Sequence, residues 1–420
     1  MAALVLTALL LPATAGAQPA GRRHSVTPST LHTTLAALLG AGDELPAGTH
    51  LRLAAGDYEL NPQVYNDSTC GNCEDPNTPV VATVGLRLSG VGIVVEGVHA
   101  DSVRIRTRAG YGILFDGCAD CRLAHVTLTE GQRDPDPNAT DAAVVVKHST
   151  VRVENCRIRD NIGDFTTVTK VVVGIIGIAG REGARIEASG NSILRNSWDG
   201  IALYRGAQAT IENNRIDGVD KARGKQIGGG RGVGIGLTWD SRATVRRNHV
   251  TRYWKGIGVF VDAHADVREN VVEDILTWGI AYWDAGSGKP VARIESNVVY
   301  GTGACGISLA RDRASAPGDP EPGSCRNNVV ADTGRNPEYD DGEVYCAQRP
   351  IASASMPPGF ALDANATFQN RRPQGAESED TGPEDFAHLA APLVSELSAV
   401  PLFRESLALA TLRRALPTLR

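Results

Sequence analysis

The chain has 420 residues, a formal net charge of −6, and 42% hydrophobic against 21% charged residues. This balance excludes a disordered or fibrous protein, and the negative net charge provides no basic field for a phosphate backbone, so we expect no nucleic acid partner. Only 5% of residues are aromatic, whereas 46 are glycine. A core built from Val, Ile, Leu and Ala is typical of stacked β-strands.

The N-terminus has the pattern of an export signal. An apolar run from Met1 to Leu11 is followed by Ala15, Gly16 and Ala17. Small residues of this kind precede signal cleavage sites, so residues 1–17 are predicted to be a signal peptide. The run is too short to span a membrane. We therefore expect a secreted or periplasmic protein without stable membrane insertion.

The eight cysteines are an even number, which suits an oxidising compartment. Two pairs are close in sequence, Cys70 with Cys73 and Cys118 with Cys121. Four thiolates could alternatively bind zinc, but the long interval between the two pairs exceeds the usual spacing of a zinc ribbon. Disulfide bonds are the favoured interpretation.

Residues 18–47 are predicted to form an N-terminal helical cap. Leu31, Leu35, Leu38 and Leu39 share one helical face, and Gly40 ends the helix. A repeated motif follows, in which one asparagine precedes a final apolar pair. The repeated asparagines are Asn155, Asn191, Asn214, Asn248, Asn270, Asn297 and Asn328.

A second repeated element begins with Gly-Ile, as at Gly200-Ile201 and Gly256-Ile257, so each repeat holds two or three short strands. A unit this small buries its apolar side chains only by stacking on identical neighbours. The sequence from Gly48 to Val330 resembles the right-handed parallel β-helix proteins of the pectin-lyase-like superfamily, including the NosD-like group. The resemblance implies an all-β fold with three short strands per rung and turn asparagines that bond along the stack.

The expected organisation is a β-helix over residues 48–333, followed by an irregular or helical C-terminal capping tail over residues 334–420. Caps are expected because the edge strands of an open stack invite aggregation. The sequence indicates a single chain that acts as a monomer.

Strand alternation predicts which side chains of the Gly-Ile strands point outward, because successive residues face opposite sides. One outward column is predicted to contain Leu114, Val145, Gly177, Ala202, Gly236, Gly258, Ala281 and Ser308. The next contains Asp116, Lys147, Ala179, Tyr204, Thr238, Phe260, Trp283 and Ala310. In this register Asp116 and Lys147 are expected to form a surface ion pair.

The resemblance implies that this face binds an extended polysaccharide. Aromatic rings suit flat sugar faces, and a basic insertion enters the same rungs. The candidate substrate-binding residues are Trp198, Tyr204, Trp239, Trp254, Phe260, Trp278, Trp283 and Arg231. Alternatively, the bulky rings close gaps beneath loops.

Aspartates recur just past these strands, and Asp240, Asp262 and Asp284 are the candidate catalytic carboxylates. Neighbouring rungs are about 4.8 Å apart, so such carboxylates could act as an acid and base pair or recruit a Ca²⁺ ion. Lys255 or His264 could abstract a proton beside a uronate carboxylate. Aspartate is also a common turn residue, which is the competing explanation.

The sequence therefore predicts a polysaccharide-binding and polysaccharide-cleaving protein, either a lyase or a glycoside hydrolase, acting on a uronate-type or other extended glycan. The motif sets of polygalacturonases and mannuronan epimerases are missing, so neither activity transfers residue by residue. The alternative is a noncatalytic carbohydrate-binding or NosD-like periplasmic scaffold protein.

Overall fold

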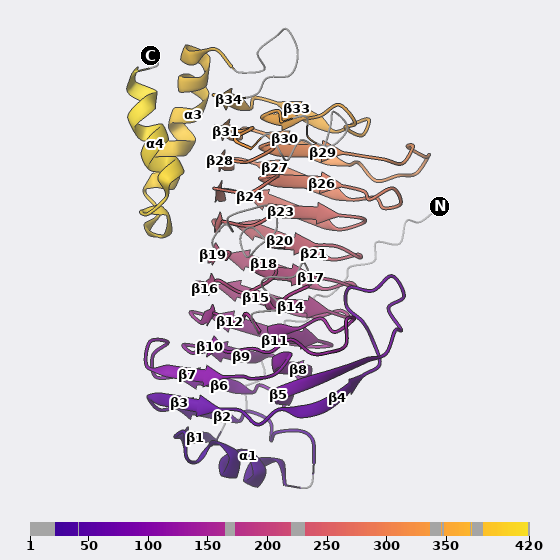
Figure 1. The fold of residues 1–420 in the computed structure, drawn as a ribbon, viewed down its shortest axis with the longest axis vertical. Coiled ribbons are helices and arrows are strands. Elements are labelled where there is room, and N and C mark those ends of the chain that lie inside the picture. Colours follow the sequence, from indigo (N-terminus) through magenta and orange to yellow (C-terminus); the bar gives the residue numbers. More distant parts are fainter. Residues whose placement is uncertain are drawn as a thin grey trace, which may run out of the picture.

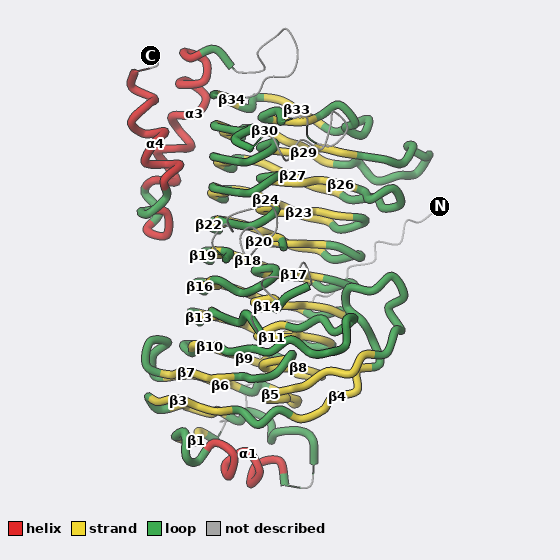
Figure 2. The backbone as a smooth tube through the Cα atoms, viewed as in Figure 1, coloured by secondary structure: helices red, strands yellow, loops and turns green. Residues whose placement is uncertain are grey.

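The computed structural model describes residues 22–40, 42–163, 173–219, 232–336, 346, 348–369, 371 and 381–418. The predicted signal peptide lies outside this range. Figure 1 shows a tall stack of rungs with a helix beneath it and two helices along one flank. Figure 2 shows that each rung alternates short strands with turns.

Three sheets run along the stack, and β-strands of successive rungs pair in parallel. Sheet A consists of β1 (Arg23–Val26), β2 (His50–Leu53), β6 (Val94–Gly97), β9 (Cys121–Ala124), β12 (Thr150–Glu154), β15 (Arg185–Ser189), β18 (Gln208–Glu212), β21 (Arg242–Arg246), β24 (His264–Arg268), β27 (Val291–Glu295), β30 (Gly323–Arg326) and β33 (Ala361–Asp363).

Sheet B follows sheet A within each rung. It consists of β3 (Gly56–Glu59), β7 (Val103–Arg106), β10 (Thr127–Thr129), β13 (Arg157–Arg159), β16 (Ser192–Leu194), β19 (Arg215–Asp217), β22 (His249–Thr251), β25 (Val271–Glu273), β28 (Val298–Tyr300), β31 (Val329–Ala331) and β34 (Ala366–Phe368).

Sheet C contains the Gly-Ile strands. It consists of β4 (Gln63–Asp67), β5 (Val80–Val91), β8 (Tyr111–Ala119), β11 (Ala142–Lys147), β14 (Ile176–Arg181), β17 (Ile201–Leu203), β20 (Val233–Leu237), β23 (Lys255–Phe260), β26 (Ile280–Trp283), β29 (Ile307–Ala310) and β32 (Ile351–Ala352). The edge strand β4 pairs antiparallel with β5.

The core is an aliphatic column inside the stack. Ile201, Ile235, Ile257 and Ile280 lie in register on adjacent strands of sheet C and are fully buried. Each rung presents only a few apolar side chains, so the column becomes continuous only when rungs stack. The predicted β-helix is thus confirmed.

An asparagine ladder occupies the turn between sheets A and B. The side-chain Nδ2 of Asn248 donates to Asn270 Oδ1 at 3.1 Å, and Asn270 Nδ2 donates to Asn297 Oδ1 at 3.0 Å. The ladder continues past Asn328 to Asn365, which accepts at 2.9 Å. At its other end Cys156, not Asn155, holds the ladder position, and its backbone N–H donates to Asn191 Oδ1 at 2.9 Å.

The predicted role of Asn155 is therefore wrong by one residue. Asn155 has a φ of 52°, the left-handed conformation that Asn213, Glu269 and Asn327 adopt immediately before their ladder asparagines. Asparagine tolerates this conformation better than most residues do. Asn155 therefore suits the left-handed turn position and is not a member of the ladder.

The two ends of the chain cover the stack differently. Helix α1 (Leu31–Leu39) buries Leu31 and Leu35 in the core beside β1. Strands β32–β34 add a rung beyond the expected boundary at residue 333. Helices α3 (Pro383–Ser398) and α4 (Leu407–Ala415), with the 3₁₀ turns η2 (Pro401–Phe403) and η3 (Leu416–Thr418), pack on the outer face of sheet B (Figure 1).

Both close cysteine pairs form disulfides, Cys70–Cys73 and Cys118–Cys121, and a third joins Cys305 to Cys346. Cys156 and Cys325 are free and buried. Within the described ranges, no helix has the length and apolar character needed to cross a membrane.

Candidate functional site

The outer face of sheet C has nearly the expected register. Ala202 pairs with Gly236, Gly236 with Gly258, and Gly258 with Ala281, so the small-residue column is confirmed over these rungs. One strand differs by two residues: Ala179 takes the place expected for Gly177, and Arg181 the place expected for Ala179. The shift places a cation where the sequence register predicts a methyl group.

A cluster of buried charges follows from this shift. Lys147 Nζ donates to Asp67 Oδ1 at 2.6 Å, and Arg181 donates to Asp67 Oδ2. Tyr111 Oη lies 3.3 Å from Asp67 Oδ2. Burial alone would raise the pKa of Asp67, but Arg181 and Lys147 hold that pKa below its usual value. Asp67 lies at the end of β4, so the cluster attaches this edge strand to the stack.

The expected ion pair between Asp116 and Lys147 is not formed. Asp116 instead accepts from Arg87 at 3.1 Å and from the hydroxyl of Tyr65 at 3.2 Å. Lys147 is 3% exposed and is committed to Asp67. The prediction fails because the strand that supplies Asp67 follows no repeat pattern.

Three predicted aromatic residues gather over the first part of this face. Trp198, Tyr204 and Trp239 pack in one apolar cluster with Ala202 and Tyr65. Tyr204 is 4% exposed, and Trp239 Nε1 donates to Asn72 Oδ1 at 3.4 Å. These rings therefore contact the β4–β5 segment, as expected of side chains that fill space beneath loops.

A second aromatic group lies two rungs further along the stack. Lys255 Nζ is 4.3 Å from the ring centroid of Trp278 and 5.7 Å from that of Trp254. Phe260 lies over Gly258, where an added Cβ would be 2.2 Å from the ring. Trp283, on the strand next to Phe260, donates from Nε1 to Asp312 at 2.8 Å.

Asp199 is a buried carboxylic acid beside the first aromatic group. It accepts the backbone N–H of Val233 at 2.6 Å and lies 3.5 Å from the hydroxyl of Tyr204. Burial raises its pKa to about 7, since these two hydrogen bonds only partly offset the loss of hydration. Such a group exchanges protons near neutral pH.

Two candidate catalytic carboxylates meet at the turn that joins sheet C to sheet A. Asp262 Oδ1 accepts the backbone N–H of Asp240 at 2.8 Å. Burial, then the negative charge and hydrogen bond of Asp262, raise the pKa of Asp240. Asp240 therefore holds a proton more readily than an isolated aspartate does.

His264 lies beside this pair at the start of β24. Its pKa is lowered by burial and by Arg242, which donates from Nη1 to His264 Nδ1 at 3.0 Å. The neutral imidazole is therefore favoured, and because its Nδ1 accepts from Arg242, its proton is on Nε2 and its one lone pair is already engaged. We call Asp240, Asp262 and His264 the carboxylate ridge.

Asp284 does not join the ridge. It is 1% exposed and accepts backbone N–H groups from Gly286 at 3.0 Å, Asp312 at 2.8 Å and Arg313 at 3.1 Å. These contacts are those of a residue that stabilises a turn. Arg231 lies outside the described residues. Throughout the described segments, no three His, Cys, Asp or Glu side chains are grouped so that they could hold a metal ion.

Comparison with known proteins agrees with this geometry. A family model described as a right-handed beta helix region matches residues 85–222. The chain is a right-handed parallel β-helix. No curated protein matches its sequence.

Several solved β-helix structures are similar at low identity. The Dettilon tailspike protein is 15% identical over 82% of this chain and 62% of its own, with a TM-score of 0.52. The A-module of the Azotobacter vinelandii mannuronan C-5 epimerase AlgE4 is 13% identical over 84% and 94%, with a TM-score of 0.48. An alginate lyase from Paenibacillus sp. str. FPU-7 is 11% identical over 82% and 98%, with a TM-score of 0.43. These likenesses concern the fold.

Proposed function

We propose that this β-helix binds an extended polysaccharide along the outer face of sheet C and cleaves it at the carboxylate ridge. The observation that carries the proposal is the Asp240–Asp262 pair, in which Asp262 Oδ1 accepts the backbone N–H of Asp240 at 2.8 Å and burial, then the charge of Asp262, raises the pKa of Asp240. The pair lies at the end of the strands that present the aromatic side chains, so a bound chain would reach it.

The ridge supplies the two groups that bond cleavage requires. Asp240, when it carries a proton, can donate it to a leaving oxygen, and Asp262 can accept a proton from water or from a sugar carbon. Hydrolysis requires a proton to be taken from water, and elimination requires one to be taken from the sugar carbon. Lys255, on its aromatic neighbours, adds a cation to the same face.

The proposal is tested by incubating the protein with a panel of uronate and neutral glycans. Ultraviolet-absorbing unsaturated ends identify a lyase, and new reducing ends without that absorbance identify a hydrolase. If no glycan yields either product while the folded protein still retains one on an affinity gel, cleavage is ruled out and binding remains.

A noncatalytic binding protein is the second candidate, and one observation favours it. Asp262 and Asp284 both accept backbone N–H groups of turns, so these carboxylates have a structural use without chemistry. The same glycan panel separates the two functions.

We also propose that the protein is exported and acts as a monomer. N-terminal sequencing of the mature protein would test the export, and its mass in solution would test the monomeric state.

A further inference from the structure

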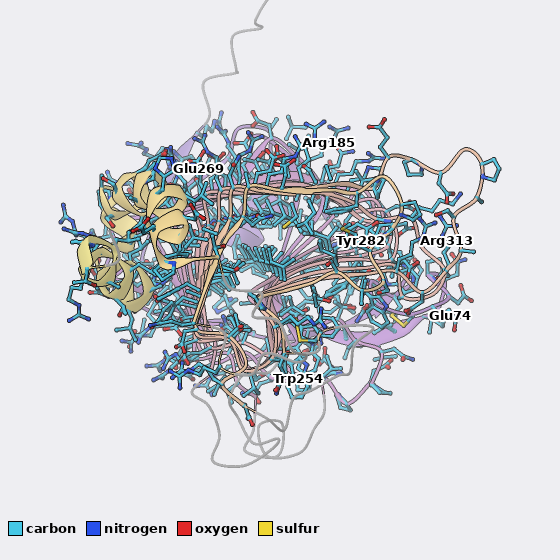
Figure 3. The ribbon with its side chains drawn as sticks, turned by 90° about the horizontal axis from the view of Figure 1, so that it is seen from above. Glu74, Arg185, Trp254, Glu269, Tyr282 and Arg313 are labelled. Atoms are coloured by element: carbon cyan, nitrogen blue, oxygen red, sulfur yellow. A yellow bond between two sulfur atoms is a disulfide. The ribbon has the colours of Figure 1, made fainter. Side chains whose placement is uncertain are left out.

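A groove of about 690 Å³ lies on the outer face of sheet A, and His264 of the carboxylate ridge forms part of its lining. Its lining comes from β9, β12, β15, β18, β21, β24 and β27 and the turn before β9. Six inter-strand steps of about 4.8 Å give a length of roughly 29 Å along the stack. Figure 3 shows Arg185 of this groove and Trp254 near sheet C on opposite sides of the molecule.

The lining carries arginines in two adjacent columns. Arg185 and Arg242 lie two rungs apart in one column, separated by Gln208. Arg152 and Arg293 lie at the two ends of the other column. The lining also contains Asp120, Glu187 and Asp266, so its four arginines leave it with a formal charge of +1, on a chain whose net charge is −6.

Two of these arginines are available to a ligand. Arg185 and Arg293 are exposed, and neither side chain has a hydrogen bond or ion pair with any residue in the described ranges. A guanidinium group presents several donors in a fixed plane and binds carboxylates in a bidentate manner. By contrast, Arg152 donates to Asp120 at 3.3 Å, and Arg242 is engaged with His264.

The remaining lining is rich in hydrogen-bond acceptors and hydroxyls. Glu187, Thr210, Thr244 and Asp266 follow one another in register between Arg152 and Arg293. Carboxylates accept hydrogen bonds from hydroxyl groups but repel a polymer that is charged at every unit. This mixture therefore suits a chain that carries both hydroxyls and spaced carboxylates, and it disfavours nucleic acid.

We propose that the groove on sheet A is a second binding surface for an acidic, hydroxyl-rich polysaccharide, and that it meets the sheet C surface at His264 of the carboxylate ridge. Arg185 and Arg293 bind its carboxylates, and the acidic and hydroxyl side chains between them bind its hydroxyls. Two surfaces on opposite sides of one β-helix hold two polymer chains, or two parts of one chain, and so raise the retention of a polymer above that of either site alone.

The test uses the double variant Arg185→Ala/Arg293→Ala, which leaves Arg242 and His264 beside the ridge intact. The matched control is Arg404→Ala/Arg414→Ala, which removes two exposed arginines from the C-terminal helical segment. Retention in gels containing polygalacturonate, and in gels containing neutral dextran, is measured at two salt concentrations. We expect the groove variant to lose polygalacturonate retention about fivefold or more at low salt, with less loss at high salt, while the control keeps it.

Unchanged polygalacturonate retention in the groove variant would overturn the proposal, as would an equal loss in the control, which would indicate a net-charge effect. Competition by duplex DNA as strong as that by soluble polygalacturonate would overturn the assigned ligand class. Failure of the proposal for sheet C can be told apart from failure of this one. It would show as an absence of glycan products, whereas retention that depends on Arg185 and Arg293 would persist.

Discussion

Burial is the largest cause of the raised pKa of both Asp199 and the ridge carboxylate Asp240. Asp240 is exposed and responds to a neighbouring charge as well as to partial burial, whereas Asp199 is 6% exposed and responds chiefly to burial. A buried carboxyl with a folded-state pKa of about 7, against an ordinary value of 3.8, binds a proton that the unfolded chain releases. Folding stability must therefore depend on pH through this residue.

The first prediction concerns Asp199→Asn. Between pH 4 and 7 the folded wild type binds more protons than the unfolded chain, so its free energy of unfolding falls as pH rises, by roughly 4 kcal/mol from this group. Asparagine does not ionise, so the variant should gain stability relative to wild type between pH 4 and 8. Urea unfolding at several pH values measures the difference.

The exposed residue Asp43 provides the control for this experiment. Asp43→Asn should give a difference from wild type that stays nearly constant over the same pH range. A difference for Asp199→Asn that is equally constant would show that Asp199 is ionised in the folded protein and that its burial does not shift its titration.

The second prediction concerns the buried charges at Asp67. Asp67→Ala leaves the buried cations of Lys147 and Arg181 without their shared carboxylate, so we expect a loss of about 3–5 kcal/mol in the free energy of unfolding. Asp57→Ala, which removes exposed ion pairs to Arg104 and Arg106, should cost less than about 1 kcal/mol. Equal effects in the two denaturation curves would contradict the structural role of the cluster.

At the scale of elements, the asparagine ladder is the feature that the repeat motif predicts best. Asn270 Nδ2 donates to Val245 O at 2.9 Å and to Asn297 Oδ1 at 3.0 Å, and its Oδ1 accepts from the backbone of Asn248 at 2.9 Å. One fully buried amide therefore satisfies groups on three successive turns. A residue with this many buried partners is costly to remove.

The third prediction is that Asn270→Ala lowers the free energy of unfolding by about 2–4 kcal/mol, because it leaves buried backbone groups without partners. Asn66→Ala, at an exposed position of the edge strand β4, should change it by less than about 0.5 kcal/mol. Thermal or urea unfolding compares the two. A loss at Asn270 no larger than that at Asn66 would mean that the ladder adds nothing to stability.

Sequence periodicity predicts the rungs, the inward isoleucines and most ladder positions, because these follow directly from stacking. It does not predict Asp67 as the partner of Lys147, because β4 lies outside the repeats and runs antiparallel. It also misplaces Arg181, because the long insertion before β14 hides the start of that strand. The site is predicted less well for a similar reason: strand alternation predicts that Tyr204 points outward, but it does not predict the β4–β5 segment that packs against it.

At the scale of the whole molecule, the C-terminal helices protect one flank of the stack. Phe386, Val394 and Leu409 pack against Val298 and Val329 on the outer face of sheet B. Without the helices these valines, and others of sheet B, would form an exposed apolar surface.

The fourth prediction is that a chain ending at residue 371 associates, whereas the full-length chain remains monomeric. Light scattering after size-exclusion chromatography measures the mass of each chain. Leu409→Ala, which removes one buried side chain of α4, is a milder control and should lower stability without exposing the whole flank. A monomeric truncated chain with unchanged stability would show that the helices are dispensable.

The central claim is that the carboxylate ridge cleaves a polysaccharide bound along this β-helix, and the product yield of Asp240→Asn/Asp262→Asn tests it most directly. On the glycan that wild type degrades best, the variant should lose about a hundredfold or more in rate while its retention of that glycan stays within about twofold of wild type. Cleavage by the variant at the wild-type rate would contradict the claim.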